Sequence, residues 1–240
     1  MNIPRKLVGM FGYDLARISK YQPNIESHLQ LLFKSLDIDL VLDVGGNNGA
    51  YGLLLREFGY EGEIISFEPV QRCYARLLRH SVNDRHWSAY NFALGPRKAE
   101  MTITVPESDD FSSFLDVAPS AKEKWSEVFA TVEREVVRVE RLDDVVAEMG
   151  LAPESRNVFL KLDTQGYDLE VLKGAANVIG DLKGMQSEIS MIPIYQGMPN
   201  YLESLTRFHE LGFKLTGLYP VARDKATLQI IEMDCVMRRD

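Results

Sequence analysis

Short apolar runs alternate with stretches of helical spacing along most of the chain. Five runs of five or six residues have the length and apolarity of buried strands, and apolar side chains recur every three or four residues after several of them. This alternation predicts an α/β fold with a mostly parallel sheet and helices on both faces. The expected strands are Leu40–Val44, Glu63–Phe67, Ala89–Leu94, Asn157–Leu162 and Gly184–Ile189.

The two ends of the chain follow other patterns. Residues 1–39 have helical spacing and a helix-cap candidate in Asn24, so we expect a helical segment that covers the sheet or the active site. Residues 213–219 and 227–237 are typical of two antiparallel strands, which would give the sheet an antiparallel edge. Residues 40–240 are enough for one α/β domain with a full core.

The middle of the chain holds a long insertion. Residues 99–105 and 136–140 alternate like a pair of hairpin strands, and residues 106–135 lie between them. A connection of this length inside a compact domain is usually functional or mobile. We interpret residues 106–135 as a lid or an acceptor-binding insertion, and a helix over Asp168–Ile179 is expected further on.

A glycine-rich turn joins the first strand to its helix. The turn carries Gly45, Gly46 and Gly49, and the next strand ends in Glu68, an arrangement typical of nucleotide binding. Asp43, two residues before the first glycine, would repel a pyrophosphate but suits a cationic ligand such as S-adenosylmethionine. An NAD site, or a turn used only for packing, stays open on this pattern alone.

Charge and cysteine content narrow the class of protein. With 27 basic and 35 acidic residues the net charge is −8, which argues against binding to nucleic acid or to an anionic membrane. Cys73 and Cys235 have no metal or redox spacing and suggest a cytoplasmic protein with reduced thiols. No stretch reaches transmembrane length, and the oligomeric state, a homo-oligomer included, is left open.

Seven short motifs, in order, resemble the FkbM family of S-adenosylmethionine-dependent methyltransferases. The resemblance covers about residues 40–190, and residues 7–20 and 212–238 look like its bacterial branch associated with polysaccharide and glycolipid biosynthesis. Gly46 and Gln165 stand where the family more often has Ala and Glu. The motifs are Asp43–Gly49, Ser66–Pro69, Asn91–Gly95, Ser112–Ser113, Arg141–Asp144, Lys161–Ala175 and Gln186–Ser190.

The resemblance implies a Rossmann-like class I methyltransferase fold with a seven-stranded sheet. It also implies an O-methyltransferase whose acceptor is a sugar hydroxyl in a polysaccharide, glycolipid or other glycosylated product. The alternatives are a polyketide hydroxyl or an amine as acceptor, an NAD-dependent oxidoreductase, and a module that binds without turnover. The implied cofactor-binding residues are Asp43, Gly45, Gly46, Asn47, Gly49, Glu68, Pro69, Asn91, Ala93 and Ser113.

Several of these residues have a structural alternative. Glu68 would accept the ribose hydroxyls, and Asn91 and Ala93 would lie along the adenine. Asp43 could bind near the methionine part or cap the helix after the turn. Ser113 could touch the cofactor or cap the lid.

Two carboxylates are the candidate catalytic groups. Asp163 and Glu188 follow strands on the far side of the sheet's switch point, so they should meet the glycine turn in one crevice. A partly desolvated carboxylate beside another has a raised pKa, which suits a base for a hydroxyl. The two could instead hold Mg²⁺ or Mn²⁺, or Glu188 could pair with Lys161 or Lys173.

Overall fold

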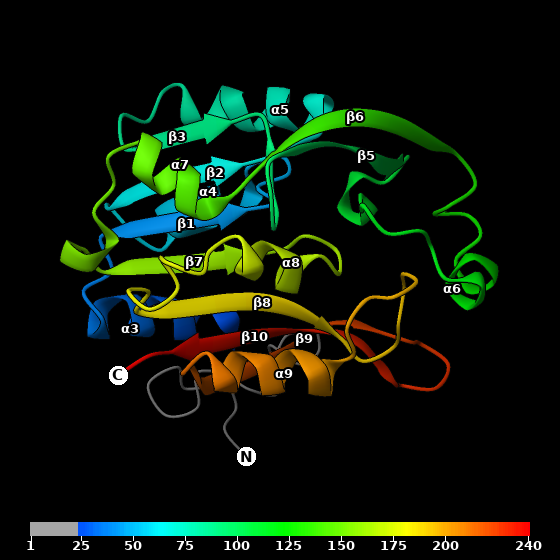
Figure 1. Ribbon diagram of the computed structural model, residues 1–240. Helices are drawn as coiled ribbons and strands as arrows, with labels where there is room; N and C mark the ends of the chain where they lie inside the picture. The colour runs from blue at the N-terminus through cyan, green and yellow to red at the C-terminus, as the bar shows by residue number, and fades with distance from the viewer. Residues whose placement is uncertain (1–23) are drawn as a thin grey trace, which may run out of the picture.

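A seven-stranded sheet forms the centre of the molecule in a computed structural model that describes residues 24–240 (Figure 1). Its first five strands run parallel, and β10 pairs antiparallel with both β8 and β9. The mostly parallel sheet with an antiparallel C-terminal hairpin is therefore confirmed. The order is β3 (Trp87–Tyr90), β2 (Glu63–Phe67), β1 (Leu40–Val44), β7 (Val158–Leu162), β8 (Gly184–Ser190), β10 (Ile230–Arg238) and β9 (Lys214–Arg223).

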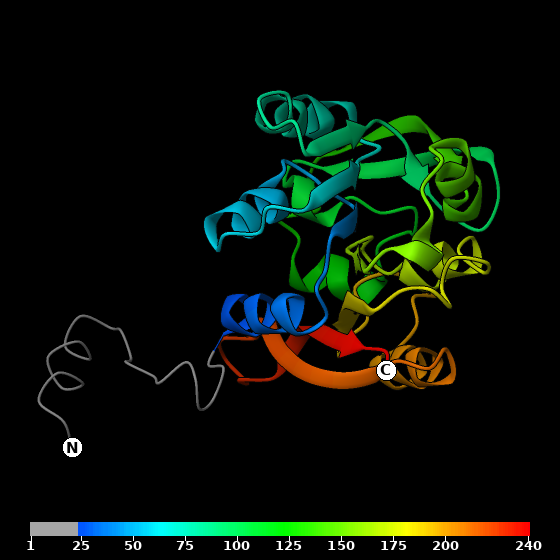
Figure 2. The ribbon, with the colours of Figure 1, turned by 90° about the vertical axis from the view of Figure 1, so that its left-hand side faces the viewer.

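Helices cover both faces of this sheet (Figure 2). One face carries α3 (Ile25–Ser35), α4 (Ala50–Glu57) and α5 (Gln71–Ser81), and the other carries α7 (Leu142–Glu148), α8 (Asp168–Lys173) and α9 (Tyr201–Glu210). Strand β1 explains the arrangement: Leu40 and Leu42 pack into one core while Val41 packs into the other. A strand buried on both faces has a nearly continuous apolar sequence, which explains the short apolar runs seen in the sequence.

A second, three-stranded sheet lies beyond the carboxyl ends of the parallel strands. It consists of β4 (Ala93–Leu94), β6 (Val132–Glu140) and β5 (Ala99–Pro106), with the short helices η1 (Asp109–Phe111) and α6 (Pro119–Lys124) beside it (Figure 1). The pairing of β5 with β6 confirms the expected hairpin. The expected insertion is shorter than predicted because β6 already begins at Val132.

One predicted strand and one predicted helix are wrong. The expected strand Ala89–Leu94 is two strands, because the chain leaves the main sheet after Tyr90 and β4 pairs with β6 instead. The expected helix Asp168–Ile179 ends at Lys173. Gly174 follows it, where a Cβ atom would lie 2.0 Å from the carbonyl oxygen of Gly95, so the chain turns against a neighbouring backbone.

The N-terminal segment is described from residue 24 onward. The side chain of Asn24 accepts a hydrogen bond from the Ser27 amide and caps α3, as expected. The remainder of the predicted N-terminal helical segment, with the family-like stretch 7–20, lies outside the described residues. Within residues 24–240, the structure contains no helix with both the length and the apolarity to cross a bilayer.

Candidate functional site

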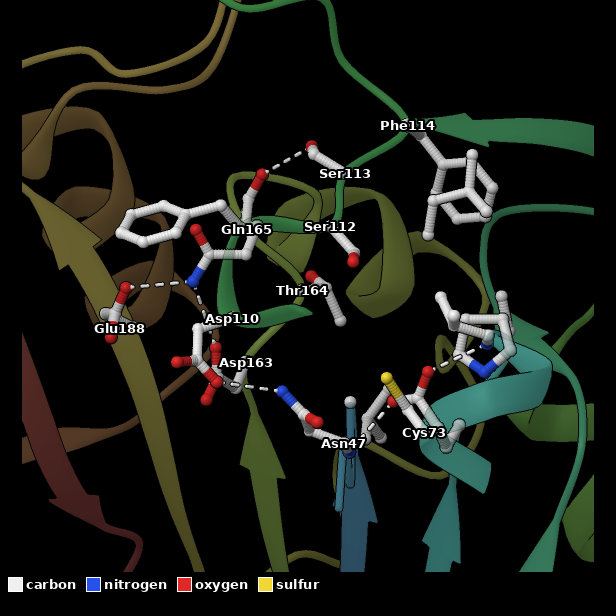
Figure 3. A pocket seen from close by; sticks show the side chains of 18 of the residues that line it. Asn47, Cys73, Asp110, Ser112, Ser113, Phe114, Asp163, Thr164, Gln165 and Glu188 are labelled. Carbon is white, nitrogen blue, oxygen red and sulfur yellow. Dashed lines mark hydrogen bonds between the residues drawn. The ribbon is translucent and has the colours of Figure 1, made fainter. Parts of the chain in front are cut away.

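A cavity of about 390 Å³ opens where β1, β2 and β7 end, beneath the loop that contains η1 (Figure 3). Most of the predicted site residues meet here, although they come from distant parts of the chain. Four of them, Asp43, Gly46, Gly49 and Asn91, do not line it. Those that do are Gly45, Asn47, Glu68, Pro69, Ala93, Ser113, Asp163 and Glu188.

The glycine turn brings the end of β1 against the end of β7. Gly45 has φ +78°, and a Cβ atom on it would lie 1.9 Å from the carbonyl oxygen of Asp163. The amides of Gly45 and Gly46 both donate to the carbonyl of Phe67, which ties the turn to β2. Gly49, with φ +89°, is the N-cap of α4. The turn therefore needs glycine for its backbone geometry and for its approach to β7.

Asp43 stabilises the glycine turn through a buried ion pair with Lys161. It is fully buried, accepts a hydrogen bond of 2.7 Å from the Ser66 hydroxyl, and lies 3.3 Å from the ammonium of Lys161. The alternative role as helix cap is wrong, because Gly49 occupies the N-cap of α4 and no side chain caps that helix. Lys161 also donates to the carbonyl of Gly45 at 3.0 Å, so the buried ion pair holds the turn in place.

Glu68 is the acid at the end of β2 and forms one wall of the cavity. Its two oxygens accept the amides of Asn47 and Val70, each at 2.8 Å. Only 5% of Glu68 is exposed, and burial raises the pKa of this carboxyl to about 7 despite both hydrogen bonds. An acid this desolvated gains most from a ligand that donates hydrogen bonds to it, such as a ribose.

The raised pKa of Glu68 predicts a pH-dependent loss of stability. The folded protein binds the Glu68 proton more tightly than the unfolded chain, because the pKa is about 7 when folded and 4.5 ordinarily. The stability gained from this protonation is fully present below pH 4.5 and is lost as the pH rises through 7. Between pH 4.5 and 7, the free energy of unfolding of the unmodified protein should fall by an amount on the order of 3 kcal/mol because of Glu68. Glu68→Gln cannot ionise at this position, so we expect its free energy of unfolding to lack this decrease. Urea unfolding at a series of pH values measures it, with Glu210→Gln on exposed α9 as the control, and parallel curves for all three proteins would contradict the expectation.

The far end of the cavity from Asp163 is apolar. Ala93, Leu94, Ile103 and Phe114 line it, and such an apolar lining suits a purine ring. Asn91 acts indirectly, because its amide donates to the carbonyls of Glu68 and Pro69, both at 2.9 Å. Asn91 therefore positions the segment that carries Glu68.

Gln165 joins the two candidate catalytic carboxylates. Its side-chain amide donates to Asp163 and to Glu188, each at 3.3 Å, and Figure 3 shows it between them. Burial and then the nearby charge of Asp163 raise the pKa of Glu188 well above its ordinary value. The side-chain amide of Gln165 has two N–H donors and can donate to two acids at once, whereas a glutamate at this position would have no donor when ionised and only one when protonated.

Lys161 and Lys173 do not pair with Glu188 as the sequence allowed. Lys161 lies 3.3 Å from Asp163, and Lys173 pairs with Glu170 on the surface of α8. Burial alone would lower the pKa of Lys161, but Asp163 and Asp43 raise it above its ordinary value. Asp163 therefore lies beside a cation, whereas Glu188 lies beside Gln165 and Glu232.

The donor set does not fit the Mg²⁺ or Mn²⁺ alternative. In the part of the chain that the structure describes, no three His, Cys, Asp or Glu side chains gather as metal ligands would. Glu188 is instead hydrogen-bonded to Gln165 and to Glu232. The carboxyl groups at this end of the cavity are therefore bound by neighbouring side chains and not arranged around a vacant metal position.

The insertion closes over the cavity through three contacts. Asn47 donates to Asp110 at 3.0 Å, Ser113 donates to the carbonyl of Gln165 at 2.8 Å, and Tyr195 donates to the carbonyl of Phe111 at 2.8 Å. Ser113 is 1% exposed and also accepts the Leu115 amide, so it caps the insertion while lining the cavity. The insertion is thereby tied to the glycine turn and to the segment that carries Asp163.

Sequence reasoning missed Glu232. It lies on β10 with 6% of its surface exposed and lines the cavity beside Glu188. The available signal was an acid inside the apolar strand Ile230-Ile231-Glu232-Met233, since a buried acid in a strand is rare unless it is paired.

Comparison with known proteins assigns the family. A family model of the methyltransferase FkbM domain matches residues 43–215, which include the glycine turn, Glu68, Asp163 and Glu188. The chain belongs to the FkbM methyltransferase family. Its mostly parallel seven-stranded sheet with an antiparallel C-terminal hairpin has the Rossmann-like class I arrangement that the resemblance implied.

Individual relatives are more distant. The chain is 29% identical over 156 residues to methyltransferase sdnD of Sordaria araneosa, covering 56% of this chain and 59% of that protein. It therefore spans less than two thirds of that relative. Among solved structures, the METTL16 methyltransferase domain gives a TM-score of 0.49 at 7% identity over 97% of this chain and 75% of that one.

A further similar structure is fibrillarin from Aeropyrum pernix with natively bound S-adenosylmethionine. Its TM-score is 0.44 at 12% identity, over 83% of this chain and 66% of that one. Because both TM-scores lie below 0.5, the family assignment depends on the FkbM match alone.

Proposed function

We propose that this FkbM chain methylates a sugar hydroxyl in a polysaccharide, glycolipid or other glycosylated product. The observation that carries the proposal is the Asp163–Gln165–Glu188 group at one end of a cavity whose other end suits an adenosine. Asn47 and Asp110 add an amide and a carboxylate beside it, and such groups hydrogen-bond well to a polyhydroxylated acceptor.

The cavity suits S-adenosylmethionine in charge as well as in shape. Glu68, Asp163 and Glu188 line it, and residues 24–240 place no unpaired lysine or arginine in its lining, since Lys161 beside the glycine turn is already paired. When bound, S-adenosylmethionine supplies an activated methyl group that needs no further activation by the enzyme. The glycine turn would hold the methionine part, Glu68 the ribose, and Ala93 with its neighbours the adenine.

The residues of the chain then position the acceptor and remove its proton. Enclosure by the insertion excludes water, and the two acids fix the hydroxyl in line with the methyl group. A sugar hydroxyl is a weak nucleophile at neutral pH, so a base that takes its proton late in the reaction is needed. Glu188, with its raised pKa and without a cation partner, is the proposed base, and the Asp163 anion orients the hydroxyl.

Glu68→Ala tests the cofactor site. We expect the dissociation constant for S-adenosylmethionine to rise about tenfold or more, because one or two charge-assisted hydrogen bonds are lost. Isothermal titration of the full chain measures it, with Glu210→Ala as the exposed control. An unchanged dissociation constant would place the ribose elsewhere, and binding of NAD in place of S-adenosylmethionine would favour the oxidoreductase alternative.

The acceptor is tested by transfer of a labelled methyl group. Purified chain is incubated with methyl-labelled S-adenosylmethionine and, separately, with a panel of simple glycosides, a polyketide alcohol and an amine. Label in a glycoside ether supports the proposal, and label only in the alcohol or the amine overturns the sugar assignment.

The buried free thiols of Cys73 and Cys235 support the further proposal that the enzyme acts in the reducing cytoplasm.

A further inference from the structure

Glu188 and Glu232 lie side by side on the cavity wall, although they are on different strands. Strand β8 pairs antiparallel with β10, with Glu188 opposite Asp234 and Ser190 opposite Glu232. Residues two apart on neighbouring strands face the same side and are within reach of long side chains. The Glu188 and Glu232 carboxyl groups contact each other through a side-chain hydrogen bond, and both line the same cavity.

Each glutamate has one further hydrogen bond that fixes its orientation. Gln165 donates to Glu188, and the Ser190 hydroxyl donates to Glu232, both at 3.3 Å. The other charged or titratable groups that face the pair are Asp163, Asp234 and Tyr195. Lys161, the buried cation of this wall, pairs with Asp43 and Asp163 instead.

Two buried carboxyl groups in hydrogen-bond contact hold one proton between them, because two adjacent negative charges in a poorly solvated site repel each other strongly. Burial raises the pKa of both Glu188 and Glu232, in agreement with the contact. Sharing one proton would leave the pair with a single negative charge.

We propose that Glu188 and Glu232 act as a proton-sharing pair that receives the proton of the acceptor hydroxyl. This inference rests on the proposed function. The acceptor oxygen forms a bond to the methyl carbon as the carbon–sulfur bond breaks, and its proton passes to Glu188. The proton already on Glu188 moves to Glu232, so the pair ends neutral and the sulfur leaves as a thioether. Glu188 is the catalytic residue, and Glu232 is the positioning residue that keeps it able to accept.

The pair can be tested without an acceptor. The ¹³C carboxyl signals of the full chain, labelled at glutamate, are followed against pH, and the signal lost in Glu188→Gln identifies Glu188. We expect Glu232→Gln to increase the acidity of Glu188 about tenfold or more, because the neighbouring negative charge is removed. Glu210→Gln should change nothing. An unchanged titration of Glu188 in Glu232→Gln would overturn the pair.

Kinetics test its role in turnover. With a glycoside that is methylated, Glu232→Gln should lower kcat about tenfold, shift the acidic limb of the pH profile to lower pH and leave the KM for the glycoside unchanged. A change in KM alone would make Glu232 a binding residue and overturn the role. If no glycoside is methylated, the sugar proposal fails, while the carboxyl titration still decides whether the pair exists.

Discussion

Gly45→Ala should abolish S-adenosylmethionine binding. A Cβ atom at this position would overlap the carbonyl oxygen of Asp163 at 1.9 Å, and a backbone carbonyl cannot move aside as a flexible side chain could. The left-handed φ of +78° adds strain of about 1–3 kcal/mol. Because the displaced strand end carries Asp163, we expect the dissociation constant to rise about a hundredfold or more, measured by isothermal titration.

Gly59→Ala is the matched control for that experiment. Gly59 has a similar φ of +87°, but a Cβ atom there meets nothing within 4 Å. We expect this variant to lose about 1 kcal/mol of stability and to bind S-adenosylmethionine normally. Should Gly45→Ala bind the cofactor as tightly as Gly59→Ala, the close approach of the turn to β7 would not matter for the site.

Asp163→Asn should lower turnover far more than cofactor affinity. Asparagine keeps the shape of the side chain but removes the charge that Lys161 balances and that orients the acceptor. We expect kcat to fall about a hundredfold, the order found when one preorganised electrostatic contact is removed. The dissociation constant for S-adenosylmethionine should change less than about threefold. Formation of S-adenosylhomocysteine with a methylated glycoside measures turnover.

Asp144→Asn is the control for this change, since Asp144 is half exposed on α7 and lies outside the cavity. It should leave both quantities unchanged. Equal losses of turnover and affinity in Asp163→Asn would identify Asp163 as a binding residue for the cofactor. An unchanged kcat would mean that Asp163 does not orient the acceptor and that Glu188 acts on it without Asp163.

Four of the five parallel strands, β1, β2, β7 and β8, could be predicted closely because nearly all of their residues are buried. Strands β1 and β2 have the bounds that the apolar runs indicated, and β7 and β8 differ by one residue. The region after β3 could not be predicted in this way. Tyr90 and Ala93 are close in sequence, yet they belong to different sheets, and only the distant β6 decides this.

The candidate site shows the same division. The glycine turn, Glu68 and the two strand-end acids follow from local sequence, since parallel strands place their carboxyl ends along one edge. The link through Gln165, the pairing of Lys161 and the contact of Glu188 with Glu232 join residues from separate strands. Single-sequence patterns contain no information on such pairs.

The sequence by itself determined the fold class, the family and the position of the glycine turn, because these depend on the periodicity of apolar residues and on short contiguous motifs. Only the tertiary structure decided which acids lie beside a cation, which lie beside another acid, and which predicted residues face the cavity. The physical reason is that burial and charge environment are set by neighbours from distant segments, which meet only after the sheet has formed.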